Sequence, residues 1–179
     1  MRIIGGKYGG RNIHSPKGLP VRPTTDRTKE ALFNVLSHRL DWPQTRVLDL
    51  FAGTGNISLE CWSRGAASVT SVDKHPRCVA AIKKHKEELG IEGGKVIRMD
   101  VRKYVKQLEG PFDLIFMDPP YALPNQESLV ISILEGGGLS QDGLLIVEHT
   151  PQLKFDNLPL FESVRVYGSS ALSFFSQPE

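Results

Sequence analysis

The sequence predicts an α/β protein built on a doubly wound, mostly parallel β-sheet. From residue 46 onward, short apolar runs alternate with segments whose apolar residues recur at helical spacing. The apolar runs show little polar alternation, which indicates strands covered by helices on both faces. Two strand-like runs near the C-terminus flank a tight turn, so we expect an antiparallel hairpin at one edge of the sheet.

The first 22 residues are expected to form a basic β-hairpin extension, and residues 23–179 a single domain. Strand-like runs at 2–4 and 11–14 are separated by "GGKYGG" and followed by the turn-rich "SPKGLP". A helix is expected next, with Thr25 or Asp26 as its N-cap. Its apolar face consists of Ala31, Leu32, Val35, Leu36 and Leu40.

Strands and helices then alternate up to the C-terminal hairpin. The predicted strands are 46–51, 68–73, 95–100, 112–118 and 143–149. The predicted helices are 56–64, 75–90, 101–110 and 126–138. Gly65 closes the first of these helices and Gly90 the second, as glycine commonly does at helix C-termini. The hairpin is expected within 161–175, around "GSSA".

Composition limits the classes of protein that the sequence can encode. Hydrophobic residues make up 40% and charged residues 23%, which is typical of a globular protein. No apolar run approaches the roughly 20 residues that a bilayer-spanning helix needs, and the N-terminus lacks the apolar core of a secretory signal. Cys61 and Cys78 have no metal-binding spacing. We therefore expect free thiols in the cytoplasm, no membrane partner and no metal.

Positive charge is concentrated at the N-terminus. Residues 1–30 contain seven basic and two acidic residues, a net charge of +5, whereas the rest of the chain carries −3. A basic arm on a mildly acidic body suggests a polyanionic partner. On charge alone, a solvated basic extension is the simpler interpretation.

Acidic residues stand at or near the ends of four successive predicted strands, at Asp49, Asp73, Asp100 and Asp118. In open α/β sheets, ligands bind outside the carboxyl ends of the strands. A carboxylate there cannot be fully buried without a partner, and a sheet does not need one for stability. These four residues are therefore candidates for a binding site.

The glycine-rich turn "DLFAGTG" follows the first predicted strand. Gly53 and Gly55 let the backbone turn tightly and let a ligand approach. The turn lacks the lysine of a P-loop and the spacing of a dinucleotide fingerprint. Asp73 is suited to bond ribose hydroxyls, and Asp100 with the Val101 amide to bond an adenine. A tight turn and two helix caps would explain these residues singly, but together they favour an adenosine-type ligand.

This set of features resembles the S-adenosylmethionine-dependent methyltransferase fold, whose seven-stranded sheet ends in an antiparallel hairpin. The resemblance implies that S-adenosylmethionine is the cofactor and that the glycine-rich loop and the strand ends bind it. The cofactor-binding residues so implied are Asp49, Phe51, Ala52, Gly53, Thr54, Gly55, Asp73, Lys74, Asp100, Val101 and Thr25.

The motif "DPPY" (Asp118–Tyr121) resembles the signature of methyltransferases that modify planar amines. Such an amine is a poor nucleophile because its lone pair is delocalised into the ring. Asp118 and the Pro119 carbonyl can accept its N–H bonds in the transition state. Pro119 and Pro120 restrict the backbone, and Tyr121 offers a flat face to the base. The competing interpretation is a polar turn after a strand.

The segments "RIIGGKYGGRNI", "RPTTDRTKEALFNVL" and "LDLFAGTGNISLECWSRGA", with "DPPY", closely resemble the RsmD family. These bacterial enzymes methylate the N2 amine of a guanine in 16S rRNA. The resemblance implies 16S rRNA as partner, within a 30S subunit or an assembly intermediate. The residues implied to contact RNA or the target base are Lys7, Arg11, Arg22, Thr24, Asp26 and Arg27. One departure is "NISLECW", where the family often has a small, apolar, glycine-containing run.

Two alternatives stay open. An N6-adenine methyltransferase acting on DNA or RNA would keep the same chemistry, although no separate DNA-reading domain fits within 179 residues. A non-catalytic RNA-binding module would keep only the fold, and the intact "DPPY" motif argues against this alternative. Glu148 ends the fifth predicted strand at the same edge, and no role is assigned to it.

Overall fold

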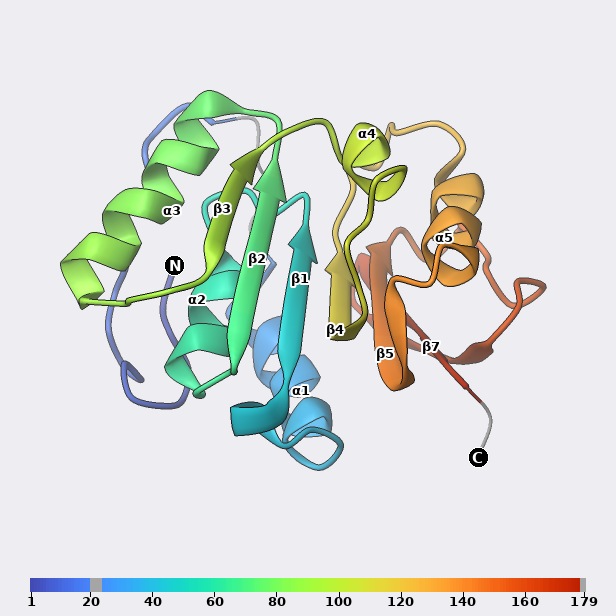
Figure 1. The fold of residues 1–179 in the computed structure, drawn as a ribbon, viewed down its shortest axis with the longest axis horizontal. Coiled ribbons are helices and arrows are strands. Elements are labelled where there is room, and N and C mark those ends of the chain that lie inside the picture. The colour runs from blue at the N-terminus through green and yellow to red at the C-terminus, as the bar shows by residue number, and fades with distance from the viewer. Residues whose placement is uncertain (20–23, 178–179) are drawn as a thin grey trace.

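The computed structural model describes residues 1–19 and 24–177, and its centre is a seven-stranded sheet (Figure 1). The strands are β1 (Arg46–Leu50), β2 (Ser68–Asp73), β3 (Lys95–Arg98), β4 (Phe112–Met117), β5 (Leu139–His149), β6 (Phe161–Tyr167) and β7 (Ser170–Ser176). The helices are α1 (Asp26–Ser37), α2 (Asn56–Ser63), α3 (Pro76–Leu89), α4 (Val101–Val105) and α5 (Gln126–Glu135), with a 3₁₀ turn at Trp42–Gln44.

The strand order is β3-β2-β1-β4-β5-β7-β6. Parallel pairing runs from β3 to β5, whereas β7 pairs antiparallel with both β5 and β6. The doubly wound, mostly parallel sheet with a C-terminal antiparallel hairpin is therefore confirmed. The chain runs outward from β1 to β3 and then returns to β4, so the order reverses between β1 and β4. Ligands bind at this reversal point in such sheets.

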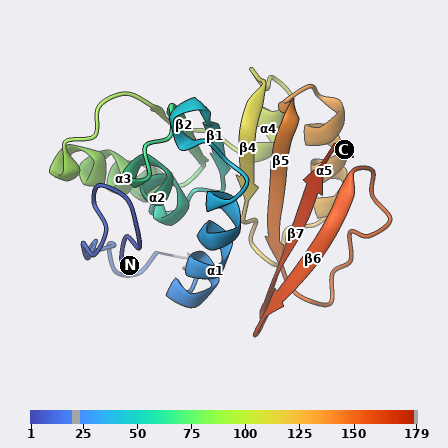
Figure 2. The ribbon, with the colours of Figure 1, turned by 90° about the horizontal axis from the view of Figure 1, so that it is seen from below.

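Successive residues of the central strands face opposite helical layers, because side chains alternate along a strand. Leu114 of β4 and Ile146 of β5 pack with α1 and α2. Ile115 and Val147 pack with α4 and α5. Figure 2 shows these two layers on either side of the sheet.

Residues 1–19, here called the N-terminal segment, pack over the layer of α2 and α3. Ile3, Tyr8 and Ile13 form a buried cluster with Leu59 of α2 and Leu89 of α3. The segment folds back on itself as predicted, but its strand pairing is reduced to one antiparallel bridge between residues 2 and 12. The predicted domain boundary at residue 22 lies outside the described residues.

A buried carboxylate anchors the N-terminal segment to α1 and α2. Glu60 of α2 accepts hydrogen bonds from the backbone amides of Ile4 and Gly5, each at 2.8 Å. Its carboxylate also lies 3.5 Å from Nζ of Lys29 in α1 and 3.0 Å from Arg64. Both Lys29 and Glu60 are fully buried, and burial lowers the pKa of Lys29. Buried charges of this kind need partners, and the segment supplies two of them.

Several element boundaries differ from the sequence-based expectation. Helix α1 ends at residue 37, before Leu40 of the expected apolar face. Helix α4 has five residues where ten were expected, and β5 begins at Leu139 where 143 was expected. Cys61 and Cys78 are free thiols, as predicted, and both are buried. Within residues 1–19 and 24–177, no helix is long and apolar enough to cross a membrane.

Candidate active site

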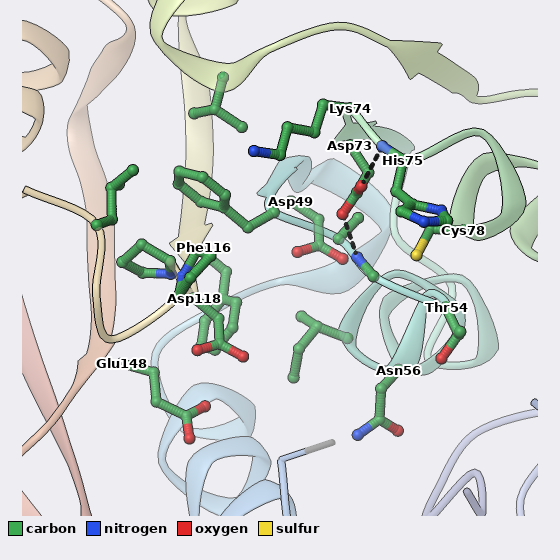
Figure 3. Close-up of a pocket in the computed structure, with 18 of the residues that line it drawn as sticks. Asp49, Thr54, Asn56, Asp73, Lys74, His75, Cys78, Phe116, Asp118 and Glu148 are labelled. Carbon is green, nitrogen blue, oxygen red and sulfur yellow. Dashed lines mark hydrogen bonds between the residues drawn. The ribbon is translucent and has the colours of Figure 1, made fainter. Parts of the chain in front are cut away.

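A cavity of about 300 Å³ opens at the carboxyl ends of β1 to β5, on the side where the strand order reverses. Figure 3 shows side chains from these strands converging on it. Its lining residues are Thr24, Asp49, Phe51, Ala52, Gly53, Thr54, Asn56, Ile57, Asp73, Lys74, His75, Cys78, Asp100, Val101, Arg102, Phe116, Asp118, Pro119, Pro120, Tyr121, Leu123 and Glu148. All four strand-end aspartates predicted from the sequence are among them.

The loop between β1 and α2 forms one wall of the cavity. Three of its residues have positive φ: Phe51 (61°), Gly53 (55°) and Gly55 (88°). The left-handed region costs little for glycine, but it is unusual for phenylalanine. Observed strain of this kind is concentrated at ligand sites, and Phe51 lines the cavity. Gly55 does not line it; it precedes the first turn of α2.

Asp49 is the most deeply buried carboxylate in the cavity wall, with 1% of its surface exposed. It accepts a hydrogen bond from the Ser58 amide at 3.0 Å and another from the Ser58 hydroxyl. Burial raises the pKa of Asp49 to about 7, against the opposing effect of the two hydrogen bonds. A cation bound in the cavity would favour the ionised form of this carboxyl group.

Asp73 braces the glycine-rich loop. Its Oδ2 accepts from the Gly53 amide at 2.9 Å and its Oδ1 from the His75 amide at 2.8 Å, and Figure 3 draws both bonds. Each carboxylate oxygen keeps a second lone pair for a ligand. The alternative in which Asp73 caps helix α3 is wrong, since His75 occupies the N-cap and accepts from Arg77.

Asp100 caps helix α4 as well as lining the cavity. It accepts from the Arg102 amide at 2.9 Å and pairs with the Arg102 guanidinium at 3.0 Å. These hydrogen bonds to Arg102 hold the pKa of Asp100 below its usual range. The helix-cap interpretation is confirmed for Asp100, and the residue stays at the cavity wall with Val101 beside it.

The segment Asp118–Tyr121 forms the wall opposite the glycine-rich loop. Asp118 follows β4 directly, and its amide donates to the Leu50 carbonyl of β1 at 3.3 Å. Tyr121 is 37% exposed, so its ring is accessible at the cavity mouth. Gln126 of α5 donates to the carbonyl oxygens of Pro120 and Tyr121 at 3.4 and 3.5 Å. The turn after the two prolines is therefore held by a side chain that sequence reasoning did not single out.

Glu148 was left without a role in the sequence, and it lies in this cavity. It ends β5 one residue before the final His149, and only 6% of its surface is exposed. Its Oε2 accepts from the Thr24 hydroxyl at 2.9 Å and its Oε1 from the Ser170 hydroxyl at 2.7 Å. The signal that could have found it is the one that found Asp118, namely an acidic residue at a strand end.

The predicted residues of "RPTTDR" divide between the cavity and its surroundings. Thr24 lines the cavity. Thr25 is exposed and caps α1 by accepting from the Thr28 amide at 3.2 Å. Asp26 and Arg27 are exposed outside the cavity lining, and Arg22 lies outside the described residues.

The two predicted RNA contacts of the N-terminal segment also lie away from the cavity. The Lys7 amide bonds to the Ser63 carbonyl, at the end of α2 opposite the glycine-rich loop. Ser63 lies six residues beyond Ile57, the last α2 residue in the cavity lining, which is about 9 Å along the helix axis. Lys7 Nζ and the Arg11 guanidinium flank the Tyr8 ring, at 5.3 and 5.6 Å from its centroid.

Within the described residues, no group of three or more His, Cys, Asp and Glu side chains could hold a metal ion. The cavity wall itself is built from a glycine-rich loop, separate carboxylates and a proline-fixed turn. This combination suits an organic ligand with hydroxyl and amine donors.

Comparison with known proteins identifies the relatives of this fold and site. Residues 1–176 match the family described as "Conserved hypothetical protein 95". The chain is 32% identical over 148 residues to ribosomal RNA small subunit methyltransferase D of Escherichia coli K12, covering 83% of this chain and 74% of that protein. It is 33% identical over 158 residues to YlbH of Bacillus subtilis, covering 86% of this chain and 85% of that protein.

A solved structure of a hypothetical protein from Thermus thermophilus is also similar. It superposes with a TM-score of 0.85 at 33% identity and covers 99% of both chains. The similarity therefore extends from the N-terminal segment to the C-terminal hairpin.

Proposed function

This chain belongs to the RsmD family of small-subunit rRNA methyltransferases, and from this premise we propose that it methylates the N2 amine of a guanine in 16S rRNA. S-adenosylmethionine is the methyl donor. One observation carries the proposal: the "DPPY" turn after β4 and the glycine-rich loop after β1 form facing walls of one cavity. A donor and an acceptor can therefore meet there.

The β1–β2 half of the cavity suits the donor. The N-terminus of α2 favours an anion such as the methionine carboxylate, and Asp49 lies nearby to favour a cation. Asp73 is available to the ribose hydroxyls, and Asp100 with the Val101 amide to the adenine. When bound, S-adenosylmethionine supplies a methyl group activated by a sulfonium. Lys74 lines the same half.

The β4–β5 half suits the amine. Asp118 and the Pro119 carbonyl accept hydrogen bonds from the two N–H groups of the target amine. These bonds draw electron density from the ring back onto the nitrogen as the nitrogen attacks the methyl group. Methyl transfer would form the N–CH₃ bond as the S–CH₃ bond breaks, and Asp118 would accept the surplus proton from the nitrogen. Tyr121 stacks on the base. Orientation of the two reactants can supply about 7–11 kcal/mol of the barrier reduction.

The target base must leave its stack to enter this cavity, as in other base-modifying enzymes. We therefore propose an unpaired or flipped guanine in 16S rRNA, within a 30S subunit or an assembly intermediate. The N-terminal segment contacts the surrounding RNA, and the protein acts in the cytoplasm, where the ribosome is.

Nucleoside mass spectrometry of 16S rRNA from a strain that lacks the protein tests the proposal. We expect the loss of one N2-methylguanosine, its return with the wild-type gene, and no return with Asp118→Ala. An unchanged N2-methylguanosine content would contradict the substrate, and a loss of N6-methyladenosine would favour an adenine enzyme. Absence of S-adenosylmethionine binding in isothermal titration would favour a non-catalytic module.

A further inference from the structure

Glu148 is the one cavity carboxylate of the β4–β5 half that the reaction scheme does not use. Its position follows from strand register. β4 and β5 pair in parallel with Met117 opposite Val147, so the next residues along, Asp118 and Glu148, lie at the same level. Asp118 lies two residues after Phe116, and Glu148 two residues after Ile146. Phe116 and Ile146 both face the α1–α2 layer, so Asp118 and Glu148 are on the same face of the sheet. Figure 3 shows the two carboxylates on the same side of the cavity.

Two hydroxyl groups orient the Glu148 carboxylate. Thr24, from the segment before α1, donates to Oε2, and Ser170 of β7 donates to Oε1. A carboxylate has about four lone-pair positions, so roughly two remain for a ligand in the cavity. Because Thr24 and Ser170 both donate to it, the Glu148 carboxylate acts as an acceptor. Since Glu148 is buried, a ligand that placed another acceptor against this carboxylate would incur a high cost in free energy.

Of the bases that carry an exocyclic amine, guanine is the one that presents two adjacent N–H donors, as two neighbouring carboxylate acceptors require. Its N2 amine stands beside N1–H, a second donor. The N6 amine of adenine and the N4 amine of cytosine each stand beside a ring nitrogen that is an acceptor. A carboxylate next to Asp118 would accept N1–H of guanine, whereas it would face the lone pair of the other two bases.

We infer that Glu148 selects guanine by accepting its N1–H while Asp118 holds the N2 amine, an inference that rests on the proposed function. Thr24 and Ser170 are positioning residues for this carboxylate. A site built to bond an N–H rejects an analogue that lacks it far more strongly than a site built on shape alone. A purely structural role, pinning α1 and β7 to β5, would not produce this preference.

The test compares two target nucleotides in reconstituted 30S particles: guanosine and 2-aminopurine riboside, which keeps the 2-amine but has a bare acceptor at N1. Methyl transfer is measured as kcat/KM for wild type and Glu148→Gln, with products identified by mass spectrometry. We expect wild type to prefer guanosine by about 10² or more. In Glu148→Gln the preference should fall at least about tenfold, because an amide can donate to the bare N1.

Controls separate this inference from the proposed function and from misfolding. Glu135→Gln, an exposed carboxylate at the end of α5, should keep the wild-type preference. Both variants should bind S-adenosylmethionine as wild type does. If Glu148→Gln does not fold, Ser170→Ala, which lies outside the cavity lining, should lower the preference at least about threefold.

A preference that stays within about twofold of wild type in the folded variant would overturn the inference and leave the proposed function standing. Failure of the wild-type protein to methylate guanosine in the particle would overturn both.

Discussion

The surroundings of individual residues at the strand ends change the protonation of their carboxyl groups, and Asp49 is the clearest case. Burial raises its pKa from 3.8 to about 7. Below pH 4 the carboxyl is protonated in both the folded and the unfolded protein. Between pH 4 and pH 7 the folded protein keeps a proton that the unfolded chain releases, so its contribution to stability is lost as pH rises through this range.

Asp49→Asn should remove this pH dependence. We expect the free energy of unfolding of wild type, relative to Asp49→Asn, to fall by on the order of 4 kcal/mol between pH 4 and pH 8. Urea unfolding of both proteins across this range measures the difference. Parallel pH profiles would contradict the raised pKa. The comparison does not require the variant to be as stable as wild type, because only the change with pH matters.

At the level of residues, the sequence identified the strand-end carboxylates because burial without a partner is unfavourable and a strand end is readable from the apolar pattern. Thr25, one of the two N-cap candidates, is confirmed as the cap of α1. The contact between the Thr24 hydroxyl and Glu148 could not be predicted, because it joins segments that are far apart in the sequence. The role of Glu148 depends on its hydrogen bonds with Ser170 of β7 and Thr24 before α1, both of which are distant in the sequence.

Among the elements, the N-terminal segment combines a buried attachment with an exposed basic surface. Glu60 and Lys29 fix it to the helical layer, and Ile3, Tyr8 and Ile13 bury its apolar side. Lys7 and Arg11 remain exposed, with their charged groups over the Tyr8 ring. Two exposed cations on an anchored segment are consistent with the proposed contact to RNA phosphates.

Lys7→Gln with Arg11→Gln should weaken binding to 30S particles or rRNA and flatten its salt dependence. We expect the slope of log K against log salt to decrease by about one unit per lost phosphate contact. The matched control is Lys103→Gln with Lys106→Gln at α4, on the opposite face of the sheet. An unchanged slope in the first variant would locate the RNA surface elsewhere, and an equal change in both would indicate a nonspecific effect of net charge.

Element order was predictable because the 3.6-residue and apolar-run patterns are strong from residue 46 onward. Boundaries that depend on contacts between distant segments were not. β5 begins at Leu139 because this residue pairs with Phe112, with a register shift before the pairing resumes between Leu114 and Leu144. Its glycine-rich flank reads as a turn in the sequence. The strands expected in the N-terminal segment shrink to one bridge because side-chain packing on α2 and α3 holds the segment instead.

For the whole molecule, the fold class could be predicted from the sequence, whereas the cavity depends on the strand order, which places β4 beside β1. The sheet pairs Leu50 at the end of β1 with Met117 at the end of β4, although the two residues are far apart in the sequence. Figure 1 shows the resulting division, with the β1–β3 half and the β4–β7 half meeting at the reversal point. The donor half and the amine half of the proposed site belong to these two parts.

The division predicts that the two halves can be disabled separately. A change in the amine half should leave donor binding intact, because the glycine-rich loop and Asp73 are held by contacts within the other half. Asp118 is the residue on which this separation depends, since it is the first residue after β4, lines the cavity and is the proposed acceptor for the target amine.

The most direct measurement is therefore the S-adenosylmethionine affinity and the single-turnover rate of Asp118→Ala, with Asp142→Ala, an exposed aspartate in β5, as control. We predict that the rate falls by about 10² to 10³ or more, as when a transition-state hydrogen-bonding group is removed elsewhere, while Kd stays within about twofold of wild type. Turnover near the wild-type rate, with the cofactor bound normally, would contradict the account.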